Sequence, residues 1–256
     1  MHRLTREVRF AVDPAGTEAL PSRIHNGYAG WPPLRPGWHY LALAVTLEGE
    51  LDPASNYLLN IKHIDQKVRE KAIPLVSSRF GSGIVRLLFD ALRDAWAGLA
   101  LREVRLALSP FLSLSMQALE YPMVRYSQKF EFSAAHRLHN PELSDEQNRQ
   151  LFGKCNNPHM HGHNYELQVT IKGEPKDHST LIAIDEFERI VAQTVIDRFD
   201  HKNLNEEVAE FRDVIPSVEN IAAVIYRMLR PQFAGKAQLA SVTVWETPKT
   251  WCEYWE

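Results

Sequence analysis

The stretch from Phe152 to Tyr165 reads FGKCNNPHMHGHNY and carries three histidines and one cysteine directly before a strand-like segment. His161 and His163 are separated by one residue, so on an extended backbone their side chains leave the same face. A third imidazole, His136, follows the strand-like segment 124–132, which we expect to lie antiparallel beside the first. Three imidazoles that leave a fourth position open are typical of a catalytic zinc site. The sequence therefore predicts zinc at His136, His161 and His163.

Two further residues of this stretch compete for a role at the metal. His159 would share the face of His161 if the loop were extended there, but Pro158 favours an irregular turn. Cys155 lies six residues before His161, and a thiol beside a divalent cation loses its proton more readily, which makes it a candidate base or nucleophile. It could instead be a fourth zinc ligand that closes a structural site. The residues alone leave both interpretations open.

Length and composition indicate a folded protein that acts on small molecules. The chain has 256 residues, enough for one large domain or for two domains, and its 45% hydrophobic and 24% charged residues are ordinary for a globular protein. A formal net charge of −3 provides no basic surface for nucleic acid. No segment resembles a membrane span or a signal peptide. We therefore expect a cytoplasmic protein with no nucleic acid and no membrane partner.

The two cysteines, Cys155 and Cys252, are too few for a disulfide framework. Cys252 stands between Trp251 and Glu253 in an aromatic segment, where a small packing residue is the simplest interpretation.

The second half of the chain predicts alternating strands and helices. In residues 163–174 apolar side chains recur at every second position, which predicts a half-buried strand. Through residues 185–199 they recur at three and four, which predicts an amphipathic helix. A second helix is expected to begin after Ser217 as its N-cap. We expect short strands at 240–245 and 250–255, and a long loop at 138–151.

The same order of elements recurs in the first half. Residues 39–50 match residues 163–174 without a gap at an offset of 124, helices are predicted at 58–75 and 84–96, and residues 104–110 fall on 242–248 at an offset of 138. We infer two copies of one ββααββ unit, an α+β fold with antiparallel sheets and helices packed on one face. The copies divide the chain into residues 1–122 and 123–256. The alternative is two unrelated α+β halves with one chance match.

The first copy lacks the polar residues of the second. Pro14 falls near the place of His136, Leu108 stands in place of Glu246, and the segment that carries Asp200 has no counterpart. We therefore interpret residues 1–122 as structural and residues 123–256 as catalytic.

Two other polar positions of the second half are weaker candidates on their own. Asp200 next to His201 suits proton transfer, because an aspartate can set the tautomer of an imidazole and stabilise its cation, but the pair also reads as a helix-terminating loop. Glu246 ends an apolar strand, where a carboxylate can accept two parallel N–H bonds such as those of an amino-pyrimidinone ring. A solvated charge at a strand end is the simpler interpretation of Glu246.

These segments together resemble the 6-pyruvoyltetrahydropterin synthase family of the tunnelling-fold (T-fold) group. The resemblance covers about residues 126–256 and is densest in residues 132–138, 143–146, 152–165, 200–204, 218–220 and 245–247. It implies a tandem T-fold whose first repeat is degenerate. It also implies that His136, His161 and His163 bind zinc, that Cys155 works with Asp200 and His201 in proton transfer, that Glu246 anchors a pterin, and that Ser217 and Glu219 help to line the pterin pocket. The usual Thr-Thr-Glu or Thr-x-Glu of the family reads Ser217-Val218-Glu219 here.

The resemblance further implies a carbon–oxygen lyase that converts 7,8-dihydroneopterin triphosphate into 6-pyruvoyltetrahydropterin with loss of triphosphate. Zinc would bind the side-chain hydroxyls and the Cys155 thiolate would remove a C–H proton. Bacterial relatives instead form 6-carboxytetrahydropterin, a queuosine precursor, and usually have three residues between the cysteine and His-Gly-His. Five residues separate Cys155 from His161 here, which favours the pyruvoyl product.

Members of this family form trimeric rings that stack in pairs and share sites between subunits, so the resemblance implies a homo-oligomer. Two other functions remain as hypotheses: a non-catalytic pterin- or zinc-binding protein, in which Cys155 completes the zinc site, and a degenerate scaffold.

Overall fold

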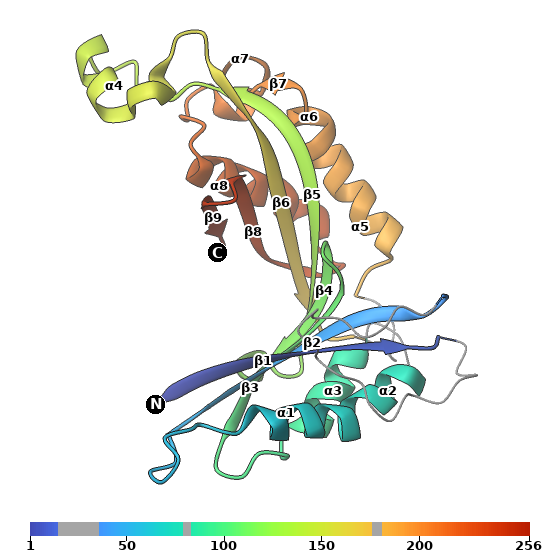
Figure 1. Cartoon of the computed structure of the whole chain (residues 1–256). Helices are drawn as coiled ribbons and strands as arrows, with labels where there is room; N and C mark the ends of the chain where they lie inside the picture. Colours follow the sequence, from blue (N-terminus) through green and yellow to red (C-terminus); the bar gives the residue numbers. More distant parts are fainter. Residues whose placement is uncertain (15–35, 79–82, 176–180) are drawn as a thin grey trace. The chain divides into compact units, whose positions relative to one another are not determined.

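The computed structural model describes residues 1–14, 36–78, 83–175 and 181–256 and divides into two compact units (Figure 1). Unit 1 comprises residues 1–126 and 172–181, and unit 2 comprises residues 127–171 and 182–256. Within the described residues, no helix combines the length and hydrophobicity that a membrane crossing requires.

Unit 1 is a four-stranded antiparallel sheet with helices on one face. Its strands pair in the order β1-β2-β3-β4. The elements are β1 (His2–Val12), β2 (His39–Gly49), α1 (Ile61–Lys67), the π-helical η1 (Val68–Ala72), α2 (Ile73–Ser78), α3 (Ile84–Leu92), β3 (Ala100–Ser109), β4 (Leu112–Gln117) and η2 (Ala118–Glu120). Alternate residues of the strands, such as Val8, Leu43 and Val104, are fully buried under these helices.

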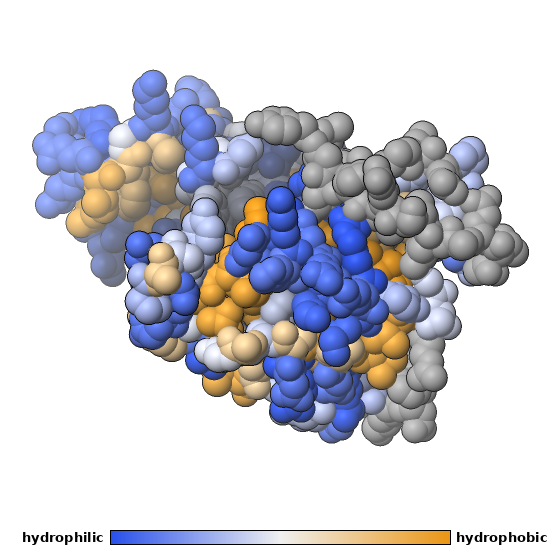
Figure 2. All heavy atoms as spheres, turned by 60° about the horizontal axis from the view of Figure 1, so that its bottom comes forward, coloured by the Kyte–Doolittle hydropathy of each residue, from blue (hydrophilic) through white to orange (hydrophobic). Residues whose placement is uncertain are grey.

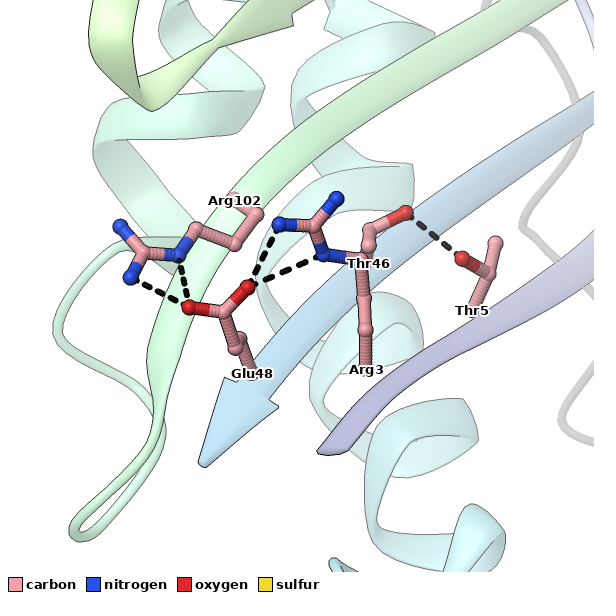
Figure 3. Close-up of polar contacts among 5 residues, drawn as sticks. All are labelled: Arg3, Thr5, Thr46, Glu48 and Arg102. Carbon is pink, nitrogen blue, oxygen red and sulfur yellow. Dashed lines mark hydrogen bonds and ion pairs between the residues drawn. The ribbon is translucent and has the colours of Figure 1, made fainter. Parts of the chain in front are cut away.

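The opposite face of this sheet carries a cluster of polar side chains. Glu48 accepts hydrogen bonds from the guanidinium groups of Arg3 and Arg102, at 2.5 to 3.0 Å, and the hydroxyls of Thr5 and Thr46 lie 2.8 Å apart (Figure 3). The polar groups of these side chains are therefore hydrogen-bonded to one another across β1, β2 and β3.

Unit 2 repeats the combination of sheet and helices. Its strands follow the order β5-β6-β8-β9, and β7 pairs with β5 in parallel. The helix α8 packs on β8 and β9 (Figure 1). The elements are β5 (Val124–His136), α4 (Asp145–Phe152), η3 (Gly153–Asn156), β6 (His161–Gly173), α5 (Ile184–Val191), the π-helical η4 (Ala192–Ile196), α6 (Asp197–Phe199), β7 (Lys202–Asn203), α7 (Leu204–Glu207), η5 (Ala209–Phe211), α8 (Val218–Leu229), η6 (Arg230–Phe233), β8 (Gln238–Thr247) and β9 (Thr250–Tyr254).

Most predicted elements of unit 2 are confirmed, and three strands, β5, β6 and β8, are longer than predicted. β5 extends to His136 and β6 begins at His161, so the metal-ligand candidates stand within the strands. The expected N-cap is confirmed, because the Ser217 hydroxyl accepts a hydrogen bond from the amide of Asn220. The prediction of an uninterrupted loop at 138–151 is wrong. Its second part forms α4, which begins with a capping box between Ser144 and Gln147.

The surface mixes hydrophilic and hydrophobic residues. Figure 2 shows a largely hydrophilic face with smaller apolar patches between the polar residues, which is ordinary because apolar atoms supply more than half of a folded protein's accessible surface. The exposed aromatic residues of unit 2 include Trp251 on β9 and Trp255 just after it.

Candidate metal centre and its surroundings

Three strands of unit 2 bring four possible metal ligands to one end of the sheet. His136 is the last residue of β5, His161 and His163 are the first and third residues of β6, and Glu246 is near the end of β8. Each shares its strand face with buried core residues, such as Phe132, Tyr165 and Val244. Strand periodicity therefore directs all four side chains into the layer between sheet and helices.

The four side chains lie within coordination distance of one another. One ligand atom from each of His136, His161, His163 and Glu246 lies within 4.8 Å of all the others. The Nε2 atoms of His136 and His161 are 3.0 Å apart, and His163 Nε2 is 2.8 Å from Glu246 Oε1. Among the described residues, this is the one group of three or more such side chains that satisfies this criterion.

Hydrogen bonding prepares His136 to bind a metal through Nε2. Its Nδ1 lies 2.6 Å from the carbonyl oxygen of Pro216, which can only accept, so Nδ1 carries the proton and Nε2 keeps its lone pair. Burial lowers the pKa of His136. A buried, neutral imidazole fixed by a backbone carbonyl is the usual form of a metal-binding histidine.

Two imidazole nitrogens of the cluster have no hydrogen-bond partner among the described residues. They are Nδ1 of His161 and Nε2 of His163, both of which are buried. His163 Nε2 is close to the Glu246 carboxylate, but the orientation is not that of a hydrogen bond. Burial also lowers the pKa of His163. Zinc binds imidazole nitrogen and carboxylate oxygen, and it usually takes four ligands. The three histidines and Glu246 match zinc in both respects.

The backbone restricts which residues can stand just before His161 and between His161 and His163. An added Cβ at Gly162 would lie 3.2 Å from the carbonyl oxygen of Ala134, so a side chain would press on β5. Met160, just before β6, has a φ of +64°, which is uncommon for a residue other than glycine. The chain therefore turns sharply at Met160 and is extended from His161 onwards. His159 is exposed and lies outside the ligand cluster.

Cys155 lies in the short helical segment that follows α4 and precedes β6. It belongs to η3, its carbonyl oxygen accepts a hydrogen bond from the amide of Leu138 just after β5, and its residue is half-buried. Burial raises the pKa of Tyr165, with further contributions from Glu246 and Cys155. The Tyr165 hydroxyl lies 3.4 Å from His136 Nδ1. Glu246 and Cys155 thus both contribute to the raised pKa of Tyr165. Cys155 is not one of the four clustered ligands.

Asp200 and His201 form a dyad. Asp200 Oδ2 lies 2.8 Å from His201 Nδ1, and Asp200 Oδ1 accepts a hydrogen bond from the amide of Ser133. The bond from Ser133, and then that from His201, lowers the pKa of Asp200. His201 has a φ of +58°, and its amide donates to the carbonyl oxygen of Ser133. Its side chain is 83% exposed, so the imidazole is accessible to another molecule.

The dyad faces a shallow pocket of about 510 Å³. The lining includes His201, His163 and Asn164, but not Cys155. No hydrogen bond or ion pair in the described part of the chain joins Cys155 to Asp200 or His201. Within the described part of one chain, the proposed thiol and the proposed proton-transfer dyad are therefore not joined by a hydrogen bond or an ion pair.

The remaining candidates lie at the start of α8. Ser217 is the N-cap and Glu219 is in the first turn of the helix, next to the Pro216 carbonyl that holds His136. The sequence reasoning missed Pro216 and Tyr165 as partners of the centre. The even spacing of Tyr165 from His163 could have indicated the latter, since both lie on one strand face.

The fold and the site together define an α+β protein with a candidate three-histidine metal centre at one end of an antiparallel sheet. A family model described as 6-pyruvoyl tetrahydropterin synthase matches residues 125–256. The chain belongs to this family.

Relatives cover about half of the chain. The 6-pyruvoyl tetrahydrobiopterin synthase of Drosophila melanogaster is 39% identical over 137 residues, which are 53% of this chain and 81% of the relative. The human protein of the same name is 39% identical over 47% of this chain and 83% of its own length. The 6-carboxy-5,6,7,8-tetrahydropterin synthase of Haemophilus influenzae is 27% identical over 52% of this chain and all of its own length.

A solved structure shares the fold over about half of the chain. The 6-pyruvoyl tetrahydropterin synthase of Caenorhabditis elegans aligns with a TM-score of 0.51 and 34% identity, over 53% of this chain and 96% of that chain.

Proposed function

We propose that the chain is a zinc-dependent 6-pyruvoyltetrahydropterin synthase, a carbon–oxygen lyase that acts on 7,8-dihydroneopterin triphosphate. The observation that carries this proposal is the convergence of His136, His161 and His163 at one end of the sheet, with Cys155 outside the ligand set. Family membership supports it, as do two similar relatives that are named 6-pyruvoyl tetrahydrobiopterin synthase.

In the proposed reaction, different residues bind the metal, remove the proton and hold the pterin ring. A zinc ion held by His136, His161 and His163 would polarise the side-chain oxygens of the substrate and make the adjacent C–H bond more acidic. Cys155 removes that proton as a thiolate. Ser217, Glu219 and Glu246 hold the pterin ring.

The reaction is an internal redox change. The first side-chain carbon is oxidised while the ring is reduced from the dihydro to the tetrahydro form. Triphosphate leaves the third carbon, which becomes a methyl group, and the second carbon becomes a carbonyl. No external oxidant or reductant is needed.

The experiment that tests this function measures the product. Zinc-loaded protein incubated with 7,8-dihydroneopterin triphosphate should release triphosphate and give 6-pyruvoyltetrahydropterin by mass spectrometry. Formation of 6-carboxytetrahydropterin would support the second candidate, which the relative from Haemophilus influenzae favours at lower identity. Absence of triphosphate release would contradict both.

Cys155→Ala separates catalysis from mere binding. We expect zinc content to be unchanged and turnover to fall by about 10²- to 10⁴-fold, as for loss of a positioned acid or base. Loss of zinc in this variant would instead show that Cys155 is a metal ligand and would favour a non-catalytic zinc- or pterin-binding protein.

We further propose that the active enzyme is a homo-oligomer in which Asp200 and His201 of one chain serve Cys155 of another. This proposal is supported by the exposed His201 imidazole, and by the absence of a hydrogen bond or ion pair between the dyad and Cys155 in the described part of one chain. Cys155→Ala and His201→Ala should each be inactive alone. Co-expressed with different tags and purified together, the two variants should regain activity, because some sites then contain both native residues. No recovery in the mixed oligomer would contradict a shared site.

The first half is proposed to be a degenerate T-fold repeat, spanning residues 1–122, that acts as a scaffold beside a catalytic repeat at 123–256. Both halves contain two strands, a long helix, a second helix and two strands. The long helix of each contains a π-helical segment, at Val68–Ala72 and at Ala192–Ile196. These segments are offset by 124 positions, as are the matching strand sequences. Because π-helical segments are rare, their shared position supports two copies of one unit.

A further inference from the structure

Glu246 is a part-buried carboxylate without a cationic partner in the described part of the chain. Its side chain is 18% exposed, and its ionic contacts are with His163 and His136, at 2.8 and 3.9 Å. A carboxylate held away from water needs a positive charge nearby. Among the residues that the structure describes, neither a lysine nor an arginine forms an ion pair with Glu246.

The distances around Glu246 match those between the ligands of one metal ion. Zinc binds imidazole nitrogen and carboxylate oxygen at about 2.0 to 2.2 Å, so neighbouring ligands of a tetrahedral site lie about 3.3 Å apart. The distances between ligand atoms are 3.0 Å for His136 and His161, 2.8 Å for His163 and Glu246, and 3.9 Å for His136 and Glu246. Two of these distances are shorter than the ligand–ligand distance of about 3.3 Å, and one is longer. Glu246 therefore lies where a fourth ligand of the metal would lie.

We propose that Glu246 is the fourth ligand of the metal when no substrate is bound, and that recognition of the pterin ring removes it from the metal. The inference rests on the proposed function, because it requires a metal at the three histidines and a pterin substrate. It adds that one carboxylate has two alternative partners. Bound to the metal, Glu246 closes the site. Paired with the N–H groups of the ring, it opens the coordination position that the substrate hydroxyls need.

This arrangement links recognition to activation. A pterin that offers the right pair of N–H donors releases Glu246, whereas a hydroxylated molecule without that ring leaves the metal closed. The same residue would then determine specificity and control access to the metal.

The test uses cobalt in place of zinc, because the visible absorption of Co²⁺ reports its ligands. The full chain loaded with Co²⁺ should show the intense bands of a four-coordinate site, and Glu246→Gln should change them. The zinc dissociation constant of Glu246→Gln should rise by about tenfold or more, since even partners outside the coordination sphere affect affinity by about 10- to 100-fold. The matched control is Glu253→Gln, an exposed carboxylate on β9, which should leave both the spectrum and the affinity unchanged.

A second measurement uses the unaltered protein, so it does not depend on folding of the variant. Adding 7,8-dihydropterin, which has no side chain and cannot reach the metal through hydroxyls, should change the cobalt spectrum by releasing Glu246. No spectral change on adding this pterin, or identical spectra and affinities for the chain and Glu246→Gln, would overturn the inference and leave the proposed function intact. Failure of the unaltered chain to bind either metal would overturn both.

Discussion

At the scale of single residues, the candidate centre depends on backbone conformation as much as on side chains. Three described residues other than glycine have a positive φ: Asn56, Met160 and His201. Two of them border the candidate site, since Met160 precedes the candidate ligand His161 and His201 belongs to the proposed dyad. Such conformations persist only where the surrounding structure holds them, and they are frequent at functional sites.

The strain at Met160 leads to a stability prediction. Met160→Gly should be more stable than Met160→Ala by about 1 kcal/mol, because glycine adopts a positive φ without the steric cost that a Cβ imposes. Both variants remove the same side chain beyond Cβ, so each is the control for the other. Urea unfolding of the two variants under one set of conditions measures the difference. Equal stability would show that Met160 is not strained.

Glu120 in unit 1 predicts a dependence of stability on pH. Hydrogen bonding to Arg125, and then to Lys172, lowers the pKa of Glu120 from 4.5 to about 2. The lowered pKa means that its stabilisation is fully present above pH 4.5 and is lost as the pH falls toward 2. Glu120→Gln should reduce the free energy of unfolding by about 2 kcal/mol at pH 7. The difference should shrink by roughly half or more at pH 3, and a constant difference across this range would contradict the assignment.

Single residues were predictable where strand periodicity fixes direction. The spacing of His161 and His163 placed them on one face, and the structure confirms that they lie together with His136. The relation of Cys155 to His201 was not predictable. These residues belong to different loops, and no local periodicity relates the directions in which their side chains point.

At the scale of elements, the sequence identified the helices but not their internal irregularities. The predicted helices at 58–75 and 185–199 exist, yet each contains a π-helical turn, which apolar spacing does not reveal. The helix α4 was missed because polar residues dominate it. Its capping box of Ser144 and Gln147 was the available signal.

One buried amide holds α4 in place. Asn148 is fully buried. Its oxygen accepts a hydrogen bond from the amide of Asn140, and its side-chain nitrogen lies within bonding distance of the carbonyl oxygens of Asn140, Leu143 and Ser144. Replacing this side chain would leave several backbone groups without a partner, each at a cost of about 1 to 3 kcal/mol.

Asn148→Ala should therefore loosen α4 without unfolding the sheet. Hydrogen exchange of residues 140–152 should become faster by roughly tenfold or more, since about 1.4 kcal/mol of lost local stability corresponds to tenfold. Gln150→Ala, on an exposed position of the same helix, should leave the exchange rates near those of the unaltered chain. Unchanged protection in Asn148→Ala would show that other contacts hold α4.

At the scale of the whole molecule, the chain combines two units of similar construction and unequal chemistry. The family model covers residues 125–256, and the metal-ligand cluster found among the described residues lies entirely within unit 2. The polar face of unit 1 uses its charges internally, as in the pairing of Glu48 with two arginines (Figure 3). Composition alone did not distinguish the two halves; the positions of individual residues did.

We expect unit 2, and not unit 1, to bind the metal. We expect one equivalent of zinc per chain, by elemental analysis of the purified protein. His39 of unit 1 matches His163 at the offset of 124, so His39→Ala is the matched control for His163→Ala. The former should leave the zinc content unchanged, and the latter should reduce it strongly, because a ligand is lost. Loss of zinc in His39→Ala would show that unit 1 also binds metal.

The π-helical turns at equivalent positions of the two units also carry a historical consequence. A widened turn arises when one residue is inserted into an established helix. If a doubled gene produced this chain, the insertion is older than the doubling, and both descendants inherited it. Ancestral one-unit proteins should then already show the widened turn, so its presence or absence in present-day one-unit members dates the duplication against the insertion.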